Sequence, residues 1–360
     1  MDYKSLSDIC SYVNERIATN DINLNQYIST ENMIPNKGGV TKSKKLPNGK
    51  TTKAYKKGDI LISNIRPYFR KIWHATQEGG CSGDILVVRA KQGVNSRFLY
   101  YLLSSDSFFE FDNATSKGTK MPRGDKKAIM QYRIPDLPPE NEQKVASILG
   151  SLDKRIILNE KINHHLEQIA MLLFDKFFPN VTMGKNTVGE YIIPKRGKGL
   201  LSKDAVAGEF PIIAGGLQPA AYHNSANTKA PVITISASGA NAGFVNLWTI
   251  PVWSSDSSFI DESITNNVYF WYIMLKKRQK EIYDAQTGSA QPHIYPKHIT
   301  AMLTTELQTK EVEKFNEKIG PLFEDVGNRQ KEITKLQMLR DTLLPRLMSS
   351  ATIISSSSTK

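Results

Sequence analysis

Apolar residues recur at steps of four and three from Glu140 to Phe178, with Asn159 and Asn163 as polar positions in the same seam. This spacing predicts a long amphipathic helix with a coiled-coil stripe. The seam recurs 170 residues later, from Lys310 to Met348. A constant offset indicates an internal duplication, since two unrelated surface helices would not share one. The residues expected to pair the helices are Val145, Leu149, Leu152, Ile156, Leu166 and Leu173, and Phe315, Ile319, Leu322, Val326, Leu336 and Leu343.

The segments that precede each helix have the patterns of mixed α+β domains. Tyr55 to Ile62 and Asp84 to Val88 are short strand-like runs, and Arg97 to Phe111 has the apolar density of a helix. Ile134 to Glu140 is rich in proline, which keeps the chain extended and marks a domain edge. We therefore predict a domain over 1–139, a helix over 140–178, a second domain over 179–309, a second helix over 310–348, and a serine-rich disordered tail over 349–360.

The duplication extends into the domains. Asp84 and Asn95 match Asp256 and Asn267 at an offset of 172, while Gly118 and Pro122 match Gly288 and Pro292 at 170. The front portions, roughly 1–80 and 181–250, resemble each other much less. Two copies that read different targets through different loops would diverge in this way.

The order of segments constrains how the helices pair. A helix of 39 residues is about 57 Å long. The second domain follows the end of the first helix and precedes the start of the second, so its termini meet at one place only if the helices are antiparallel. The predicted fold is two mixed α/β domains alternating with two long helices, which pair as an antiparallel coiled coil with pseudo-twofold symmetry.

Length and composition support a multidomain globular protein. The chain has 360 residues, of which 40% are hydrophobic, which suits two or three domains. Cys10 and Cys81 match no metal-ligand spacing and indicate no disulfide framework. The N-terminus lacks the regions of a signal peptide, and no run reaches the roughly 18 apolar residues that span a bilayer. We expect a soluble, cytoplasmic protein.

The charge of the chain favours a phosphate-bearing partner. The formal net charge is +12, and residues 1–139 carry 22 Lys and Arg against 13 Asp and Glu, whereas the predicted helices are nearly neutral. Many basic proteins bind no nucleic acid specifically, so charge alone leaves the question open.

Cationic and aromatic side chains alternate between Asn64 and Lys71, and Pro67 favours a loop or an edge strand there. Such a run could contact phosphates and base edges, or it could be an edge strand with solvated cations. A second basic loop, Ser116 to Arg123, contains glycine and proline. The residue types of this loop suit contact with a DNA backbone.

A search for catalytic motifs finds none that holds. Gly49-Lys50-Thr51 resembles the end of a phosphate-binding loop, but Lys44 stands where its first glycine belongs. His164 and His165 have no second ligand pair at a suitable spacing, so a metal site is not expected. No catalytic residue is predicted.

Several motifs together resemble the specificity subunit of type I restriction-modification enzymes. They are the run Ile134 to Gln143 leading into the first helix, Tyr283 to Ile294 closing the second domain, Leu339 to Leu347 ending the second helix, and the segment 58–67. The resemblance covers about 3–349. Two features depart from the family pattern: Thr304 to Thr309 replaces the proline-rich entry to the second helix, and the chain continues into Ser349-Ser350-Ala351.

The resemblance implies a non-catalytic, sequence-specific DNA-binding subunit. Each domain would recognise one half of a bipartite, asymmetric sequence in double-stranded DNA, and the helices would set the gap and dock two methyltransferase subunits. Those subunits would use S-adenosylmethionine, and motor-nuclease subunits would use ATP and Mg for cleavage. The DNA contacts expected on this resemblance are Lys42, Lys44, Lys45, Arg66, Tyr68, Arg70, Lys117, Lys120 and Arg123 in the first domain, and Lys195, Arg196, Lys198, Gln218, Tyr222, Ser238, Asn241 and Gln291 in the second. Two alternatives remain open from the sequence: a methyltransferase with a degenerate cofactor loop, and a coiled-coil scaffold whose basic domains bind RNA or protein.

Overall fold

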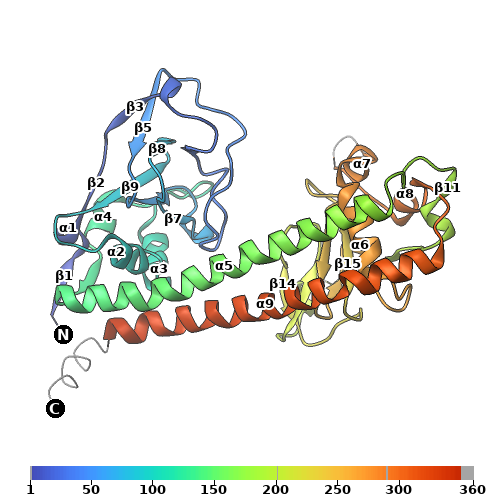
Figure 1. Cartoon of the computed structure of the whole chain (residues 1–360). Coiled ribbons are helices and arrows are strands. Elements are labelled where there is room, and N and C mark those ends of the chain that lie inside the picture. Colours follow the sequence, from blue (N-terminus) through green and yellow to red (C-terminus); the bar gives the residue numbers. More distant parts are fainter. Residues whose placement is uncertain (1, 201, 289–290, 350–360) are drawn as a thin grey trace, which may run out of the picture. The chain divides into compact units, whose positions relative to one another are not determined.

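The computed structural model describes residues 2–200, 202–288 and 291–349 (Figure 1). The chain forms two compact units, one from residues 1–156 with 335–360 and one from residues 157–334. We call them unit 1 and unit 2 and describe each by itself. Both contain sheets and helices, which confirms the predicted mixed α/β class.

Unit 1 contains two four-stranded sheets. The first has the order β2-β9-β6-β7, with all neighbours antiparallel; its strands are Cys10–Tyr12, Ile85–Ala90, Ile60–Ser63 and Ile72–His74. The second has the order β3-β5-β8-β4, with strands Arg16–Ala18, Thr51–Tyr55, Gly79–Cys81 and Tyr27–Ile28. A separate pair joins β1 (Tyr3–Ser5) to β10 (Arg133–Pro135). Every residue of β6 is buried, as expected for a central strand of β-branched and apolar residues.

The short helices of unit 1 begin at polar caps. α2 (Ser96–Leu103) starts after Asn95, whose side chain accepts from the amides of Arg97 and Phe98, and α3 (Asp106–Thr115) starts after Ser105. α4 (Lys126–Met130) is capped by Asp125. The remaining helices of the unit's front portion are α1 (Leu6–Ile9) and the 3-10 turns η1 (Thr19–Asp21) and η2 (Pro67–Phe69).

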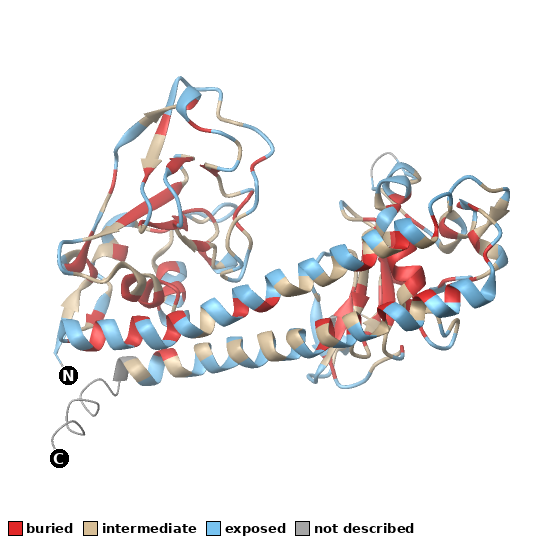
Figure 2. Ribbon diagram, in the orientation of Figure 1, coloured by how far each residue is buried: buried red, intermediate tan, exposed pale blue. Residues whose placement is uncertain are grey.

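The core of unit 1 joins its first sheet to its helices (Figure 2). Ile60, Phe98, Phe108 and Leu149 are at most 1% exposed and belong to one apolar cluster. Burial of side chains of this size is the main stabilising contribution to such a unit.

Unit 2 repeats this plan with different strands. Its four-stranded antiparallel sheet has the order β12-β18-β15-β16, with strands Lys195–Arg196, Ser257–Ile260, Val232–Ser236 and Val245–Trp248. A three-stranded sheet has the order β14-β13-β17, with strands Ala221–His223, Phe210–Ile213 and Trp253–Ser254, and β11 (Asn186–Thr187) pairs with β19 (Leu303–Thr304). The helices are α6 (Val268–Lys277), α7 (Gln279–Asp284), α8 (Pro296–Thr300), η3 (Val188–Glu190) and η4 (Ser202–Asp204).

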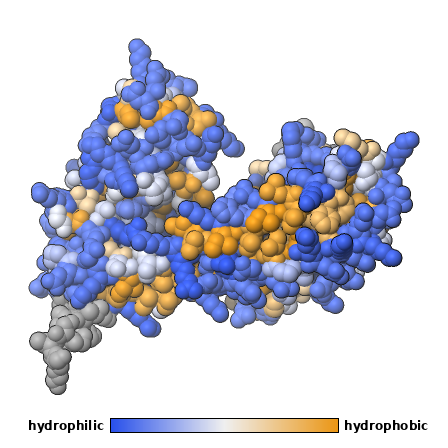
Figure 3. Space-filling model, in the orientation of Figure 1, coloured by the Kyte–Doolittle hydropathy of each residue, from blue (hydrophilic) through white to orange (hydrophobic). Residues whose placement is uncertain are grey.

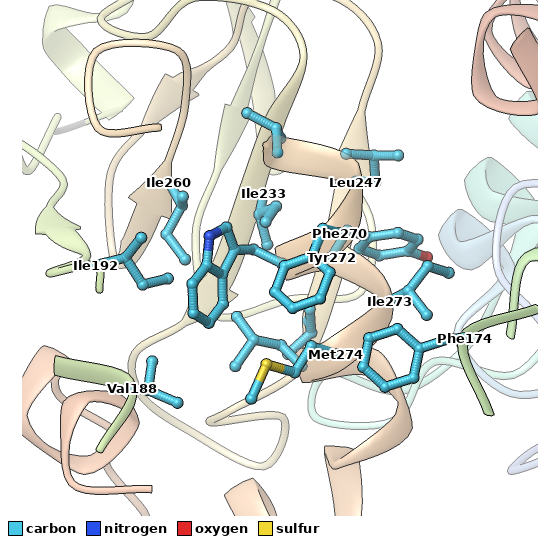
Figure 4. Packing of buried hydrophobic residues seen from close by; sticks show 14 of the residues in the cluster. Phe174, Val188, Ile192, Ile233, Leu247, Ile260, Phe270, Tyr272, Ile273 and Met274 are labelled. Atoms are coloured by element: carbon cyan, nitrogen blue, oxygen red, sulfur yellow. The ribbon is translucent and has the colours of Figure 1, made fainter. Parts of the chain in front are cut away.

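The core of unit 2 forms where α6 packs on the sheet and on both long helices. Phe270 of α6 lies 5.7 Å from the ring of Phe174, and Phe174 lies 5.6 Å from the ring of Phe315. Figure 4 shows Phe174, Phe270 and Ile273 in one cluster with Ile233 and Ile260 of the sheet. All five side chains are nearly inaccessible to solvent.

Two long helices follow the globular portions: α5 (Pro139–Phe177) and α9 (Thr309–Ser349). Within unit 2 they run antiparallel, because Phe174, late in α5, packs on Phe315, early in α9, while Asn159 contacts Glu332. Within unit 1, Arg340 of α9 donates to Asp153 of α5 at 3.0 Å. None of the described helices has the length and apolar character needed to cross a membrane.

The predicted helix-pairing residues lie on α5 and α9. The buried ones are Val145, Leu149, Ile156, Phe315, Ile319 and Val326, and the half-buried ones are Leu152, Leu166, Leu173, Leu322, Leu336 and Leu343. Their pairing role stays a prediction, since several of them also contact the cores of the units.

Two local predictions were wrong at a boundary. The predicted strand from Tyr55 to Ile62 is two strands, separated by a turn in which Gly58 has φ of 93°. The predicted helix from Arg97 to Phe111 is interrupted at Ser104 and Ser105, because the Ser105 side chain caps α3. The predicted disordered tail starts at residue 349, which is the last residue of α9, and residues 350–360 lie outside the described residues.

Candidate nucleic-acid interface

Three backbone segments of unit 1 are joined at one place. The amide of Arg66 donates to the carbonyl of Pro122 at 2.8 Å, and Ile65 forms a bridge with Arg123. The amides of Asn36 and Lys37 donate to the carbonyls of Phe69 and Arg70. We call the segments 36–37, 64–71 and 116–124 the unit 1 loop cluster. It brings together the two basic runs that the sequence analysis singled out.

Two arginines in this cluster adopt a backbone conformation that is energetically unfavourable for residues with a Cβ atom. Arg66 and Arg70 flank η2 and have φ of 53° and 51°. The left-handed region costs a residue with a Cβ atom about 1–2 kcal/mol. Unfavourable backbone conformations of this kind concentrate at functional sites, so the two side chains are candidates for contact with a ligand.

Carboxylates hold several cations of the cluster in place. Arg70 and Lys37 contact Asp106 at 2.9 and 3.0 Å, and Arg123 contacts Asp84 at 3.0 Å. Lys117 contacts Asp125 at 2.5 Å, and this hydrogen bond, with backbone amides of α4, lowers the pKa of Asp125. Exposed ion pairs contribute only about 0–1 kcal/mol each. A phosphate can therefore replace the carboxylates at small cost.

The other predicted contacts of unit 1 are placed less closely. Tyr68 is 49% exposed and lies 4.7 Å from the ring of Phe69 in the cluster, and Lys120 is exposed in the loop 116–124. The remaining three are exposed on the chain that follows the bridge between Met33 and Val40, and they are Lys42, Lys44 and Lys45.

Unit 2 contains the same backbone frame. The amide of Gly239 donates to the carbonyl of Pro292, as Arg66 does to Pro122, and Ser238 forms a bridge with His293, as Ile65 does with Arg123. The hairpin β15–β16 thus corresponds to β6–β7 at an offset of 173 residues. The loop that contains Pro292 and His293 corresponds to the loop that contains Pro122 and Arg123 at an offset of 170 residues. We call the segments 214–218, 238–244 and 287–293, where described, the unit 2 loop cluster.

Two of the predicted contacts of unit 2 meet at the carboxylate of Asp256. Arg196 contacts its carboxylate at 2.9 Å, and the Ser238 hydroxyl also donates to it. Asn241 donates to the carbonyl of Gly215 at 3.4 Å. Arg196 and Ser238 therefore share one carboxylate, whereas Asn241 joins two segments of the unit 2 loop cluster.

The remaining predicted contacts of unit 2 are exposed. Tyr222 lies on β14 with 54% of its surface accessible, and Lys195 donates to Ser263 at 3.0 Å. The others are exposed in loops or at the end of a short strand, and they are Lys198, Gln218 and Gln291.

Three contributors to the loop clusters are not among the contacts predicted from the sequence. Lys37 belongs to the unit 1 cluster through Asp106 and through its own left-handed backbone, with φ of 63°. Asp84 and Asp256 were recognised as a repeated pair, but the structure shows that each holds a cation beside a loop cluster. The repetition of Asp84 and Asp256 in the two halves of the sequence was the only sign of their importance before the structure, because their ion pairs form only in the folded chain.

Metal-binding chemistry finds no support in these clusters. Among the described residues, no group of three or more His, Cys, Asp or Glu side chains is arranged to hold a metal ion. His164 and His165 lie exposed on α5. The polar groups of the clusters are suited to contact an anionic, hydrogen-bonding surface.

Comparisons with known proteins agree on one family. A family model described as the type I restriction modification DNA specificity domain matches residues 1–168. The MjaIX type I restriction enzyme specificity subunit of Methanocaldococcus jannaschii is 26% identical over 303 residues, which cover 72% of this chain and 69% of that protein. Residues 1–168 thus match the type I restriction-modification specificity family, and the chain as a whole is similar to specificity subunits of that family.

Further relatives support this family. The HindI specificity subunit of Haemophilus influenzae is 33% identical over 185 residues, covering 48% of this chain and 40% of that protein. The crystal structure of a type I restriction-modification S subunit from M. genitalium covers 96% of this chain and 95% of its own, with a TM-score of 0.54 and 20% identity. That similarity shows a shared fold. The matching family model is described as a DNA specificity domain, and these relatives are named specificity subunits of type I restriction enzymes.

Proposed function

We propose that each unit of this specificity-family chain reads one half of a bipartite, asymmetric DNA target. The observation that carries the proposal is the repeated frame of the two loop clusters. The same backbone hydrogen bonds recur, while Arg66, Arg70 and Arg123 of unit 1 correspond to Gly239, Gly243 and His293 of unit 2. Different side chains on one frame suit different base sequences, because base edges are read by hydrogen-bonding side chains.

The positive side chains of the clusters would first contact the DNA backbone. Arg66, Arg70 and Lys117 can exchange carboxylate or solvent for phosphate, and each phosphate contact adds about 0.9 to the slope of log affinity against log salt. Tyr68 and Gln218 are exposed beside or within the loops and are suited to base contact.

The long helices would act as the spacer between half-sites. The finer fold that we propose is an antiparallel coiled coil of α5 and α9, with the two units related by a pseudo-twofold. Support comes from within each unit: Asn159 contacts Arg329 and Glu332 in unit 2, and Asp153 contacts Arg340 in unit 1. A rigid spacer of this kind would fix the length of the unread gap.

A second apolar stripe on α5 would dock one methyltransferase subunit. Leu158, Ile162, Ile169 and Leu172 follow each other at coiled-coil spacing, with His165 between them, one residue ahead of the seam that faces α9. Leu158, Ile169 and Leu172 are 56%, 46% and 69% exposed, and Figure 3 shows apolar surface over this half of α5. A contiguous exposed apolar stripe is typical of an interaction site, and a partner helix would bury it.

Catalysis would belong to the partners. Two methyltransferase subunits would bind S-adenosylmethionine, and motor-nuclease subunits would use ATP and Mg, as the family resemblance implies.

The test is to assemble the chain with its methyltransferase subunit and to measure, at several salt concentrations, the affinity for a DNA duplex that carries the sequence which this complex methylates. Arg66→Ala with Arg70→Ala should lower both the affinity and the salt slope, and relax sequence preference in one half only. Gln218→Ala with Asn241→Ala should affect the other half only. Equal effects of both pairs on both halves would contradict the assignment of one half to each unit.

A further inference from the structure

A buried polar site lies beneath the unit 1 loop cluster, where three segments meet. Asp112 of α3, Asn64 after β6, and Gly124 at the end of the basic loop approach one another. A Cβ atom on Gly124 would stand 2.3 Å from Asp112 Oδ1 and 3.0 Å from Asn64 Oδ1. The two oxygens therefore face the same small space, which a side chain at position 124 would fill.

Both side chains present acceptors to this space. Asp112 and Asn64 are 1% and 7% exposed. Asp112 Oδ1 and Oδ2 and Asn64 Oδ1 are buried and accept no hydrogen bond from any described residue. Two acceptors cannot bond each other unless one carries a proton. A protonated Asp112 would supply the missing donor, and burial raises the pKa of its carboxyl to about 7.

Unit 2 shows that the frame folds without this polar site. The amide of Gly124 donates to the carbonyl of Asn64 at 3.2 Å, and the amide of Ile294 donates to the carbonyl of Ala237 at 2.9 Å. The residue that corresponds to Asp112, at the offset of 170, is Ile282. Ala237, Ile282 and Ile294 are buried and apolar. Unit 1 thus carries a proton-binding group where its duplicate carries packing residues.

The site is connected to the side chains proposed to contact DNA. Asn64 is two residues before Arg66, and Gly124 follows Arg123, while the bridge between Ile65 and Arg123 joins the two segments. A charged Asp112 would place an uncompensated buried charge against Gly124. The segments that hold Arg66 and Arg123 would then separate more readily.

The other charged and titratable groups around Asp112 do not account for a change of charge at this site near pH 7. Tyr12 of β2 is coupled to Asp112, and its own pKa is raised, first by burial and then by Asp112, so it stays neutral near pH 7. Asp125 and Lys126 begin α4, where the Lys126 carbonyl accepts from Tyr12 at 3.1 Å. The cations that border the site from the loops are Arg66 and Arg123, the latter paired with Asp84, and Arg70 pairs with Asp106 at the start of α3. Burial is the resolved cause of the shift at Asp112.

We propose that Asp112 and Asn64 form a proton-dependent positioning pair for the DNA-contacting loops of unit 1. With Asp112 protonated, its hydroxyl donates to Asn64 Oδ1 and fixes the segments 64–66 and 122–124 against each other. The proposal rests on the proposed function, because it makes DNA affinity through unit 1 decrease as the pH rises through neutrality. Unit 2, with Ile282 and Ile294, has no such dependence.

The first measurement is DNA affinity of the assembled complex from about pH 6 to about pH 8 at fixed salt. The native chain should lose affinity severalfold as the pH rises. Asp112→Asn keeps the shape and supplies an amide donor, so its affinity should be nearly independent of pH. Glu110→Gln removes an exposed carboxylate from the same helix and should follow the native profile.

The second measurement does not require DNA. Hydrogen exchange at the amides of Arg66 and Gly124 in the free chain, corrected for intrinsic rates, should show protection that falls with pH in the native chain and not in Asp112→Asn. If amide protection in the native chain does not depend on pH, the proposal of a proton-dependent pair is overturned. In that case water or the Asn64 amide donates hydrogen bonds to an ionised Asp112 carboxylate. If amide protection depends on pH but the assembled complex binds no DNA at any pH, the positioning pair is supported and the proposed function is contradicted.

Discussion

Arg66 and Arg70 occupy backbone positions that glycine fills in the second unit. Gly239 and Gly243 have φ of 82° and 87°, where Arg66 and Arg70 have 53° and 51°. Glycine adopts this region without a steric cost, whereas arginine does not. The backbone frame forms in unit 2 with glycine at both positions, so the fold does not require arginine there. We infer that the two arginines of unit 1 are present because of what their side chains contact.

Replacing both arginines with glycine should separate folding from DNA binding. Arg66→Gly with Arg70→Gly removes the strain of two left-handed residues, which offsets the loss of the exposed contact with Asp106. We expect an unchanged or higher free energy of unfolding in urea, together with weaker DNA binding and a smaller salt slope.

Asn36→Gly is the matched control, because Asn36 also has positive φ, 54°, and carries no charge. It should change neither affinity nor slope. A variant of the two arginines that is less stable and binds DNA as the native chain does would show that their role is structural.

Asp112 should make unit 1 less stable as the pH rises. Its pKa is about 7 in the folded chain, above its ordinary value of 3.8. Folding therefore favours the protonated form: its contribution is fully present below about pH 4 and is lost as the pH rises to about 7, a difference of about 4 kcal/mol at most.

Asp112→Asn should remove this dependence. We expect thermal unfolding to occur at higher temperature than in the native chain at about pH 8, and at nearly the same temperature at about pH 4. A variant that is equally destabilised at both pH values would mean that Asp112 is held ionised in the folded chain.

The long helices combine apolar packing with a few polar contacts. Asn159 is 4% exposed, donates to Glu332 at 3.0 Å and accepts from Arg329 at 3.1 Å. A buried asparagine in an apolar seam often fixes register at a cost in stability. In the proposed spacer, register determines the distance between half-sites.

Asn159→Leu should therefore raise or maintain stability while relaxing the gap. Methylation by the assembled complex, measured on duplexes whose half-sites are one base pair closer or farther apart, should become more even. Lys161→Leu, on an exposed position of α5, serves as the control. An unchanged gap preference with unchanged stability would eliminate the register role.

The stripe on α5 is expected to act in assembly. Leu158→Ser, Ile169→Ser and Leu172→Ser together should leave the melting temperature of the chain nearly unchanged, because these side chains are exposed. They should abolish co-purification of the methyltransferase subunit. Met183→Ser with Val206→Ser changes exposed apolar side chains outside α5 and should leave co-purification intact; loss in both variants would make the effect nonspecific.

Long periodic elements were predictable from sequence, and local boundaries were not. The seam of α5 extends over many turns, so its period is visible without the fold. The break between α2 and α3 depends on one hydroxyl, because Ser105 accepts from the amide of Phe108. At the candidate site, residue type indicated Arg66 and Arg123, whereas their meeting through Ile65 and Pro122 required the tertiary structure.

At the scale of the whole chain, the two units are built on copies of one backbone frame. Each unit builds one loop cluster on the same hydrogen-bonded frame, and the copies differ in the side chains that the frame presents. Under the proposed function, selection for different half-sites would explain why the front portions diverged while the frame and the helix seams did not. The account therefore requires two separate blocks of specified bases.

The most direct test is to express the chain with its methyltransferase subunit in a host that lacks this activity, and to map methylated adenines across the genome. The account expects one asymmetric motif with two specified blocks and an unspecified gap of fixed length. Arg66→Ala with Arg70→Ala should relax one block and leave the other intact. A single continuous block, or methylation without sequence preference, would contradict it.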